Sequence, residues 1–222
     1  MKRTAAFDLD GTLAHTAPDL VGAANALLMP RGLPEMPVEA AGHTAGFGAK
    51  ALIRKAYELD GREAPEDEVD ALYQPFLDAY AERLCIDSAL YPGTLEALDG
   101  LAAEGWVLTV CTNKPEALAE GLLAALGVRD RFGALIGADT LPERKPHPSA
   151  LWEAVERAGG SRGRAVMIGD TDTDLKTAQA CALPCILTTF GYSQPCVTTL
   201  GADAVVERFA EIPDALERLL PA

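Results

Sequence analysis

Short β-like runs alternate with helical patterns along most of this 222-residue chain, and this alternation constrains the fold more than any other feature. Strands that alternate with helices are typical of a mostly parallel sheet with helices packed on its faces. We expect strands over residues 4–9, 106–112, 134–138, 164–170, 185–190 and 203–207. We expect helices over residues 94–105, 115–127, 148–159 and 174–183, several of which begin near a proline and end near a glycine. The pattern therefore predicts an α/β fold.

One segment interrupts this alternation with helical patterns alone. Three such patterns follow one another over residues 18–29, 48–58 and 66–84. In the first, four apolar residues share a face at 3.6-residue spacing: Leu20, Ala24, Leu27 and Leu28. Pro75 in the third predicts a kink or a helix boundary. We expect a helical subdomain of residues 16–86, inserted after the first strand of a core made of residues 1–15 and 87–222.

The composition excludes two kinds of partner. A formal charge of −14 repels the phosphates of nucleic acids and anionic membrane surfaces. No run approaches the ~20 apolar residues that a membrane-spanning helix needs, and the first ten residues lack the apolar stretch of a signal peptide. The odd number of cysteines, five, and the lack of zinc-type pairs fit buried free thiols in a reducing compartment. We therefore expect a cytoplasmic protein with no nucleic-acid or membrane partner.

Two aspartates, Asp8 and Asp10, end the first predicted strand, directly before Gly11 and Thr12. Residues two apart on extended backbone point the same way, so two like charges lie side by side. Gly11 permits a sharp turn, and the amides that follow it can face an anion. Such a pair needs a cation, a proton or a catalytic role, although a strand-ending turn with an Asx motif fits the same residues.

Two further groups follow predicted strands. Thr112 and Asn113 precede a helix, where a hydroxyl and exposed amides can bind a phosphate; a helix N-cap explains the pair equally well. Lys145 is followed by Pro146 and Pro148, which stiffen the backbone and fix the direction in which the lysine leaves the chain. A lysine held in this way can neutralise a phosphate, and an ordinary surface lysine is the alternative.

Three acids within five residues, Asp170, Asp172 and Asp174, follow the strand predicted over 164–170. Like charges this close repel one another unless a cation or helix amides compensate them, and one of the three is expected to cap the next helix. Because no histidine or cysteine accompanies them, the carboxylates suit Mg²⁺ better than zinc. All four groups fall at the carboxyl ends of predicted strands, where open parallel sheets build their sites.

A carboxylate pair, a hydroxyl, a lysine and a carboxylate cluster, in this order, resemble the four motifs of the haloacid dehalogenase superfamily. The resemblance covers essentially the whole chain, and the stretches FDLDGTL, CTNKPEAL, ERKPHP and IGDTDTDLKTAQ are similar to the phosphoglycolate phosphatase branch. It implies a Rossmann-like parallel-sheet core with an inserted helical cap, and a phosphoric monoester hydrolase that acts on a small phosphorylated metabolite. The chain departs from the family at His15, where an acidic residue is usual.

The resemblance also implies a role for each motif residue. Asp8 would be the nucleophile that forms an aspartyl-phosphate, and Asp10 the general acid and base. The Mg²⁺ ligands would be Asp8, Asp10 (through its backbone carbonyl) and Asp170, while Asp174 would support Lys145 or a metal-bound water. The phosphate would be bound by Thr112, Asn113 and Lys145.

The cap is expected to exclude water and to choose the substrate. The resemblance places a substrate loop at Gly46, Phe47 and Gly48, and His43, Lys50 and Arg54 are candidate charge partners. The preferred reaction is Mg²⁺-dependent hydrolysis of 2-phosphoglycolate. The alternatives are a phosphatase of another small ester (a sugar phosphate or pyrophosphate), a phosphomutase, and a phosphoryl-accepting or non-catalytic binding protein.

Overall fold

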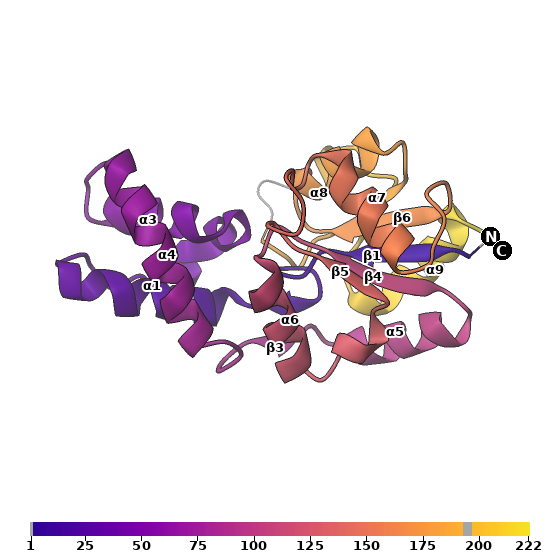
Figure 1. Cartoon of the computed structure of the whole chain (residues 1–222), viewed down its shortest axis with the longest axis horizontal. Coiled ribbons are helices and arrows are strands. Elements are labelled where there is room, and N and C mark those ends of the chain that lie inside the picture. The colour runs from indigo at the N-terminus through magenta and orange to yellow at the C-terminus, as the bar shows by residue number, and fades with distance from the viewer. Residues whose placement is uncertain (1, 193–196) are drawn as a thin grey trace. The chain divides into compact units, whose positions relative to one another are not determined.

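A six-stranded parallel sheet is the centre of the larger of two compact units, which comprises residues 1–14 and 90–222 (Figure 1). The computed structural model describes residues 2–192 and 197–222, so Cys196 and Ser193 lie outside the described part of the chain. The strands are β1 (Thr4–Phe7), β4 (Val107–Cys111), β5 (Ala134–Ile136), β6 (Ala165–Gly169), β7 (Cys185–Thr188) and β8 (Ala204–Val206). Each corresponds to a predicted strand, so the predicted α/β fold is confirmed.

The strand order is β5-β4-β1-β6-β7-β8, and every neighbouring pair is parallel. β1 is central: Phe7 is in register with Val110 of β4 on one side and with Ile168 of β6 on the other. All four β1 residues are buried, as expected for a strand with helices on both faces. The carboxyl ends of β1, β4 and β6 therefore lie side by side at one edge of the sheet.

Helices cover both faces of this sheet (Figure 1). They are α5 (Thr94–Ala103), α6 (Glu116–Ala125), α7 (Pro148–Arg157), α8 (Asp172–Ala180) and α9 (Ile212–Leu219). α7 and α8 lie on one face and α5 on the other, as Figure 1 shows. Four of the five were predicted, although α8 begins two residues earlier than expected; α9 was not predicted.

Residues 15–89 form the second unit, which is helical. It contains α1 (Ala17–Leu28), α2 (Val38–Ala41), α3 (Ala49–Leu59) and α4 (Glu66–Glu82). The predicted apolar face of α1 is buried, and α1, α3 and α4 pack against one another. α4 continues through Pro75, so the helix boundary expected there is not found. Short strands β2 (Ala14–His15) and β3 (Ala89–Leu90), absent from the sequence prediction, pair where the chain passes between the two units.

A buried carboxylate, Asp19, joins the two ends of the helical unit by hydrogen bonds. Asp19 on α1 is fully buried and accepts hydrogen bonds from the Ser88 amide (2.8 Å) and the Ser88 hydroxyl (2.6 Å). The Asp87 amide donates to both Asp19 oxygens at 3.1 Å. These contacts tie the first helix of the unit to the segment that leaves it.

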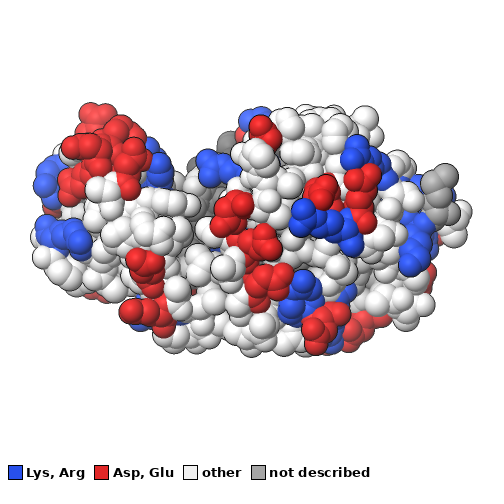
Figure 2. Space-filling model, viewed as in Figure 1, with Lys and Arg blue, Asp and Glu red and all other residues white. Residues whose placement is uncertain are grey.

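The surface carries the negative charge unevenly. Figure 2 shows acidic side chains gathered on part of the helical unit. In the same unit, the first turn of α4 contains Glu66, Asp67 and Glu68. Over residues 2–192 and 197–222, no helix combines the length and apolar character needed to cross a bilayer.

Candidate active site

The edge formed by the carboxyl ends of β1, β4 and β6 brings most of the predicted site residues together. Asp8 follows β1, and its amide donates to the carbonyl of Ile168 on β6 (2.8 Å). Thr112 follows β4, and its amide donates to the carbonyl of Ile136 (2.9 Å). Asp170 follows β6 directly. Because these parallel strands are neighbours, residues that are distant in sequence lie close together at their carboxyl ends.

Asp8 is a buried carboxylate beside an ammonium group. Its side chain is 12 % exposed, and its Oδ1 accepts from the Leu9 amide (2.7 Å) and lies 3.0 Å from Lys145 Nζ. Burial raises the pKa of Asp8 to about 6, and the charges of Asp174 and Asp10 add to the increase, while Lys145 opposes it. The charged form is therefore costly until a further cation compensates it.

Asp170 is enclosed more completely. Its Oδ1 accepts from the Thr12 hydroxyl (3.1 Å) and its Oδ2 from the Tyr192 amide (2.6 Å). Gly11 and Gly191 pack directly on it, since a Cβ atom added at either glycine would overlap the carboxylate. Burial and the neighbouring charges of Asp174 and Asp8 raise the pKa of Asp170 well above its ordinary value.

Lys145 and Asp174 form a buried ion pair. Lys145 Nζ donates to Asp174 Oδ1 at 2.7 Å, and both side chains are almost fully buried. Burial opposes the ammonium form, but Asp174 and Asp8 outweigh it and raise the pKa of Lys145. The alternative of an ordinary surface lysine is therefore wrong for Lys145.

Asp174 uses its second oxygen to organise the start of α8. Oδ2 accepts from the Thr171 amide (3.1 Å) and the Thr171 hydroxyl (2.8 Å). Thr171 is the N-cap residue of α8 and Asp174 completes a capping box with it, so the expectation that one of the three acids caps this helix is confirmed. Both Asp174 oxygens are engaged by protein donors, which fits a residue that supports Lys145.

Thr112 and Asn113 lie in the loop between β4 and α6, where their side chains bond to the protein backbone. The Thr112 hydroxyl accepts from the Lys114 amide (3.2 Å), and the Asn113 side-chain amide donates to the carbonyl of Lys145 (3.0 Å). The N-cap position of α6 belongs to Pro115, so the N-cap alternative for this pair is not found. Asn113 thus links the loop after β4 to the loop that carries Lys145.

Asp10 forms an ion pair with Lys114, a residue to which the sequence analysis assigned no role. Lys114 Nζ lies 3.0 Å from Asp10 Oδ1 and 3.3 Å from Oδ2, and the lysine side chain is 4 % exposed. The sequence contains a pattern that could have identified Lys114: it is a second lysine at a strand end, in the same TNK stretch as Thr112 and Asn113. Only the fold shows which carboxylate it meets.

The carboxylates fit a divalent cation. Within the described residues, oxygens of Asp8, Asp170 and Asp174 lie within 4.8 Å of one another. With Asp10, four carboxylates face the two ammonium groups of Lys114 and Lys145, so two negative charges are left when all the acids are ionised. Carboxylate oxygens are ligands that Mg²⁺ prefers, and a bound cation would favour the ionised forms of Asp8 and Asp170, whose pKa values burial raises.

The predicted substrate loop belongs to the helical unit. Gly46 and Phe47 lie in a 3₁₀ helix, Gly42–Phe47, and Gly48 follows it with φ 79° and ψ −171°. Phe47 is 59 % exposed. Two of the candidate charge partners form surface ion pairs, Lys50 with Asp70 (2.5 Å) and Arg54 with Glu66 (2.7 Å).

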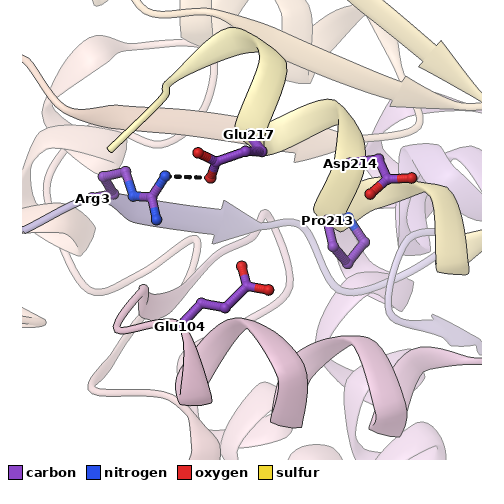
Figure 3. Close-up of a pocket in the computed structure, with 5 residues that line it drawn as sticks. All are labelled: Arg3, Glu104, Pro213, Asp214 and Glu217. Carbon is purple, nitrogen blue, oxygen red and sulfur yellow. Dashed lines mark hydrogen bonds and ion pairs between the residues drawn. The ribbon is translucent and has the colours of Figure 1, made fainter.

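A separate hollow of about 390 Å³ contains none of the predicted site residues (Figure 3). Arg3, just before β1, points toward Glu217 of α9 and pairs with it. The remaining lining residues are Glu104, Pro213 and Asp214. Because three acids line it against one arginine, this hollow does not suit an anionic phosphate ester.

Comparison with known proteins identifies the family. The family model described as haloacid dehalogenase-like hydrolase matches residues 2–182. The chain belongs to the haloacid dehalogenase-like hydrolases. The relatives include a phosphoglycolate phosphatase of Caulobacter vibrioides, 42 % identical over 217 residues, with 98 % of this chain and 92 % of the relative covered. A phosphoglycolate phosphatase of Agrobacterium fabrum is 40 % identical over 212 residues, covering 96 % and 91 %.

Solved structures agree with this assignment. The crystal structure of a predicted phosphoglycolate phosphatase from Haemophilus somnus 129pt aligns with a TM-score of 0.85 and 31 % identity, covering 96 % of this chain and 97 % of the other. The family predicted from the sequence, its similarity to the phosphoglycolate phosphatases and the class of enzyme, a phosphoric monoester hydrolase, are therefore confirmed.

Proposed function

We propose that this enzyme is a Mg²⁺-dependent phosphatase that forms an aspartyl-phosphate on Asp8 and acts preferentially on 2-phosphoglycolate. One observation carries the chemistry: Asp8 is buried against Lys145 in a carboxylate cluster, while Asp10 is held apart from that cluster by Lys114. The substrate is supported by the relatives at 35–42 % identity that are named phosphoglycolate phosphatases.

Asp8 is the proposed nucleophile because its carboxylate is oriented by the fold. The Leu9 amide and Lys145 both engage Oδ1, which holds that oxygen in place. An Asp8 oxygen attacks phosphorus, the bond between phosphorus and the ester oxygen breaks, and the phosphoryl group is left on Asp8. Lys145 offsets the repulsion between the anionic nucleophile and the anionic phosphate.

Asp10 is the proposed acid and base. It gives a proton to the ester oxygen as that oxygen leaves, so the product is a neutral hydroxyl group. It then takes a proton from a water molecule that attacks phosphorus, and the bond to Asp8 breaks to release inorganic phosphate. Thr112 and Asn113, with the amides after Asp8, are the proposed donors to the phosphoryl oxygens.

The residues present fit Mg²⁺. Asp8, Asp170 and the backbone carbonyl of Asp10 are the proposed ligands, while both oxygens of Asp174 already accept from protein donors. When bound, Mg²⁺ would neutralise charge on the transferring phosphoryl group and on the clustered carboxylates. Gly11 and Gly191 leave space for the Asp170 side chain, which a Cβ atom at either position would overlap.

The helical unit is the proposed cap, with Gly46, Phe47 and Gly48 as its substrate loop. Gly48 has a backbone conformation that glycine alone adopts readily, which allows the backbone amides of this loop to approach a ligand. A substrate that carries both a phosphate and a carboxylate suits such donors. We place the enzyme in the cytoplasm, where a small phosphorylated metabolite would reach it.

A phosphate-release screen tests this proposal. Wild type and Asp8→Asn are assayed on 2-phosphoglycolate, sugar phosphates and pyrophosphate, with Mg²⁺ and with EDTA. We expect the highest kcat/KM on 2-phosphoglycolate, no turnover in EDTA, and a loss of at least about 10³-fold in Asp8→Asn. Asp99→Asn, which alters an exposed carboxylate paired with Arg131, is the matched control and keeps full activity.

The screen separates the chemistry from the substrate. Higher kcat/KM on sugar phosphates would overturn the substrate assignment alone. Undiminished turnover by Asp8→Asn, or in EDTA, would overturn the mechanism.

A further inference from the structure

None of the proposed steps uses Lys114. It lies between β4 and α6, its side chain is almost completely buried, and its ammonium group reaches both oxygens of Asp10 at 3.0 and 3.3 Å. Burying a lysine is costly unless its charge is compensated. A contact to both oxygens also restricts rotation of the carboxylate, which a contact to one oxygen does less well.

The backbone of Lys114 is fixed on both sides. Its amide donates to the Thr112 hydroxyl (3.2 Å), and its carbonyl accepts from the Ala138 amide (2.9 Å). Gly137 packs on the same carbonyl, since a Cβ atom there would lie 2.8 Å from that oxygen. The loop therefore presents the lysine side chain in one direction, toward Asp10.

The two buried lysines serve different carboxylates. Lys145 contacts Asp8 and Asp174, and Lys114 contacts Asp10. Among the described residues, the close carboxylate cluster is Asp8, Asp170 and Asp174, and the Asp10 side chain is outside it. An Asp10 side chain without a partner of its own would be attracted to any cation bound by that cluster, where it could not transfer protons to the ester oxygen.

We propose that Lys114 is a positioning residue for Asp10: it holds the acid–base carboxylate away from the metal-binding carboxylates and in the orientation needed for proton transfer. This inference rests on the proposed function, in which Asp10 moves the protons. Lys114 acts through Asp10 and does not itself contact the transferring phosphoryl group.

A double-mutant cycle tests it. Lys114→Met keeps the length and apolar stem of the side chain and removes its charge. We expect kcat on 2-phosphoglycolate to fall by roughly 10- to 100-fold with less than about a threefold change in KM, a part of the 10²–10⁴ that a general acid contributes. In the Asp10→Asn background, Lys114→Met should cause no further loss. Lys114→Arg, which keeps the charge, should recover part of kcat.

Matched variants make the outcome specific. Lys176→Met removes a lysine that pairs with Asp172 on the exposed side of α8, and it should leave kcat unchanged. Circular dichroism of Lys114→Met confirms that it folds. An equal loss in the wild-type and Asp10→Asn backgrounds, or a loss confined to KM, would overturn the inference, because Lys114 would then act on the substrate or on the fold.

Failure of the inference is distinct from failure of the proposed function. If Asp8→Asn is inactive and Mg²⁺ is required, but Lys114→Met has wild-type kcat, then Lys114 has no positioning role and the phosphatase mechanism stands. If Asp8→Asn keeps its activity, the proposed mechanism fails first.

Discussion

Removing the charge of Asp8 should stabilise the enzyme when no metal is bound. The pKa of Asp8 is about 6 in the folded protein against an ordinary value of 3.8, so ionising this group disfavours folding. Each pKa unit corresponds to about 1.4 kcal/mol, so the ionised Asp8 costs about 3 kcal/mol of folding free energy. Asp8→Asn keeps an oxygen for the Leu9 amide and for Lys145, and it removes that cost.

The sign of the effect depends on pH. Below about pH 4, Asp8 is protonated in both the folded and the unfolded chain, so the substitution gains nothing from this source. As pH rises from about 4 to 6, wild type loses stability while Asp8→Asn does not. Above pH 7 the full difference of about 3 kcal/mol is present, equivalent to roughly 6–12 °C in Tm for a chain of this size.

Tryptophan fluorescence is a suitable assay because both tryptophans, Trp106 and Trp152, belong to the α/β unit that contains Asp8. Thermal unfolding of wild type and Asp8→Asn is followed in EDTA at several pH values from 4.5 to 8. Asp99→Asn, which removes an exposed carboxylate whose pKa is lowered by its hydrogen bond to Arg131, is the control and should show no gain.

Adding Mg²⁺ should make wild type more stable than Asp8→Asn, the reverse of the order in EDTA. A cation that binds the folded state stabilises wild type by mass action, whereas Asp8→Asn has lost a ligand and should gain little. If Asp8→Asn were no more stable than wild type at pH 7.5 in EDTA, or if the difference did not change with pH, the electrostatic account of Asp8 would be wrong.

Three further substitutions test particular contacts. Gly191→Ala should push Asp170 out of place and raise the Mg²⁺ concentration for half-maximal activity at least about tenfold, whereas Gly100→Ala, on an open helix face, should not. Asp19→Ala should destabilise the helical unit by about 2–4 kcal/mol, measured by urea unfolding, because it leaves the buried Ser88 donors without an acceptor; Asp19→Asn should cost less. Gly48→Ala should strain the substrate loop and lower kcat/KM, with the Mg²⁺ requirement unchanged, because φ 79° with ψ −171° costs about 1–3 kcal/mol for other residues.

The sheet could be predicted because its strands are buried on both faces. Each then appears in the sequence as a short apolar run, such as TAAF before Asp8 or AVMIG before Asp170. Parallel neighbours end at the same edge, which is why four separate motifs could be expected to meet there. The family resemblance supplied the roles of these residues, which spacing alone left open.

The features that could not be predicted from the sequence depend on tertiary contacts. α9 has only eight residues and packs on α5, and a helix this short is stabilised mainly by such packing. β2 and β3 have two residues each, too few for a recognisable pattern. The role of Lys114 depends on which side chain its ammonium group meets, and the TNK stretch does not contain that information.

Phosphorylation of Asp8 is the most direct test of the proposed chemistry. Wild type, Asp10→Asn and Asp8→Asn are mixed with 2-phosphoglycolate and Mg²⁺, quenched in acid within milliseconds, and analysed by peptide mass spectrometry. We expect one added phosphoryl group on the peptide that contains Asp8 in wild type, slower formation of it in Asp10→Asn because the general acid is lost, and none in Asp8→Asn. Release of inorganic phosphate with no phosphorylated Asp8 peptide in wild type or in Asp10→Asn, or with the phosphoryl group on another residue, would contradict the mechanism.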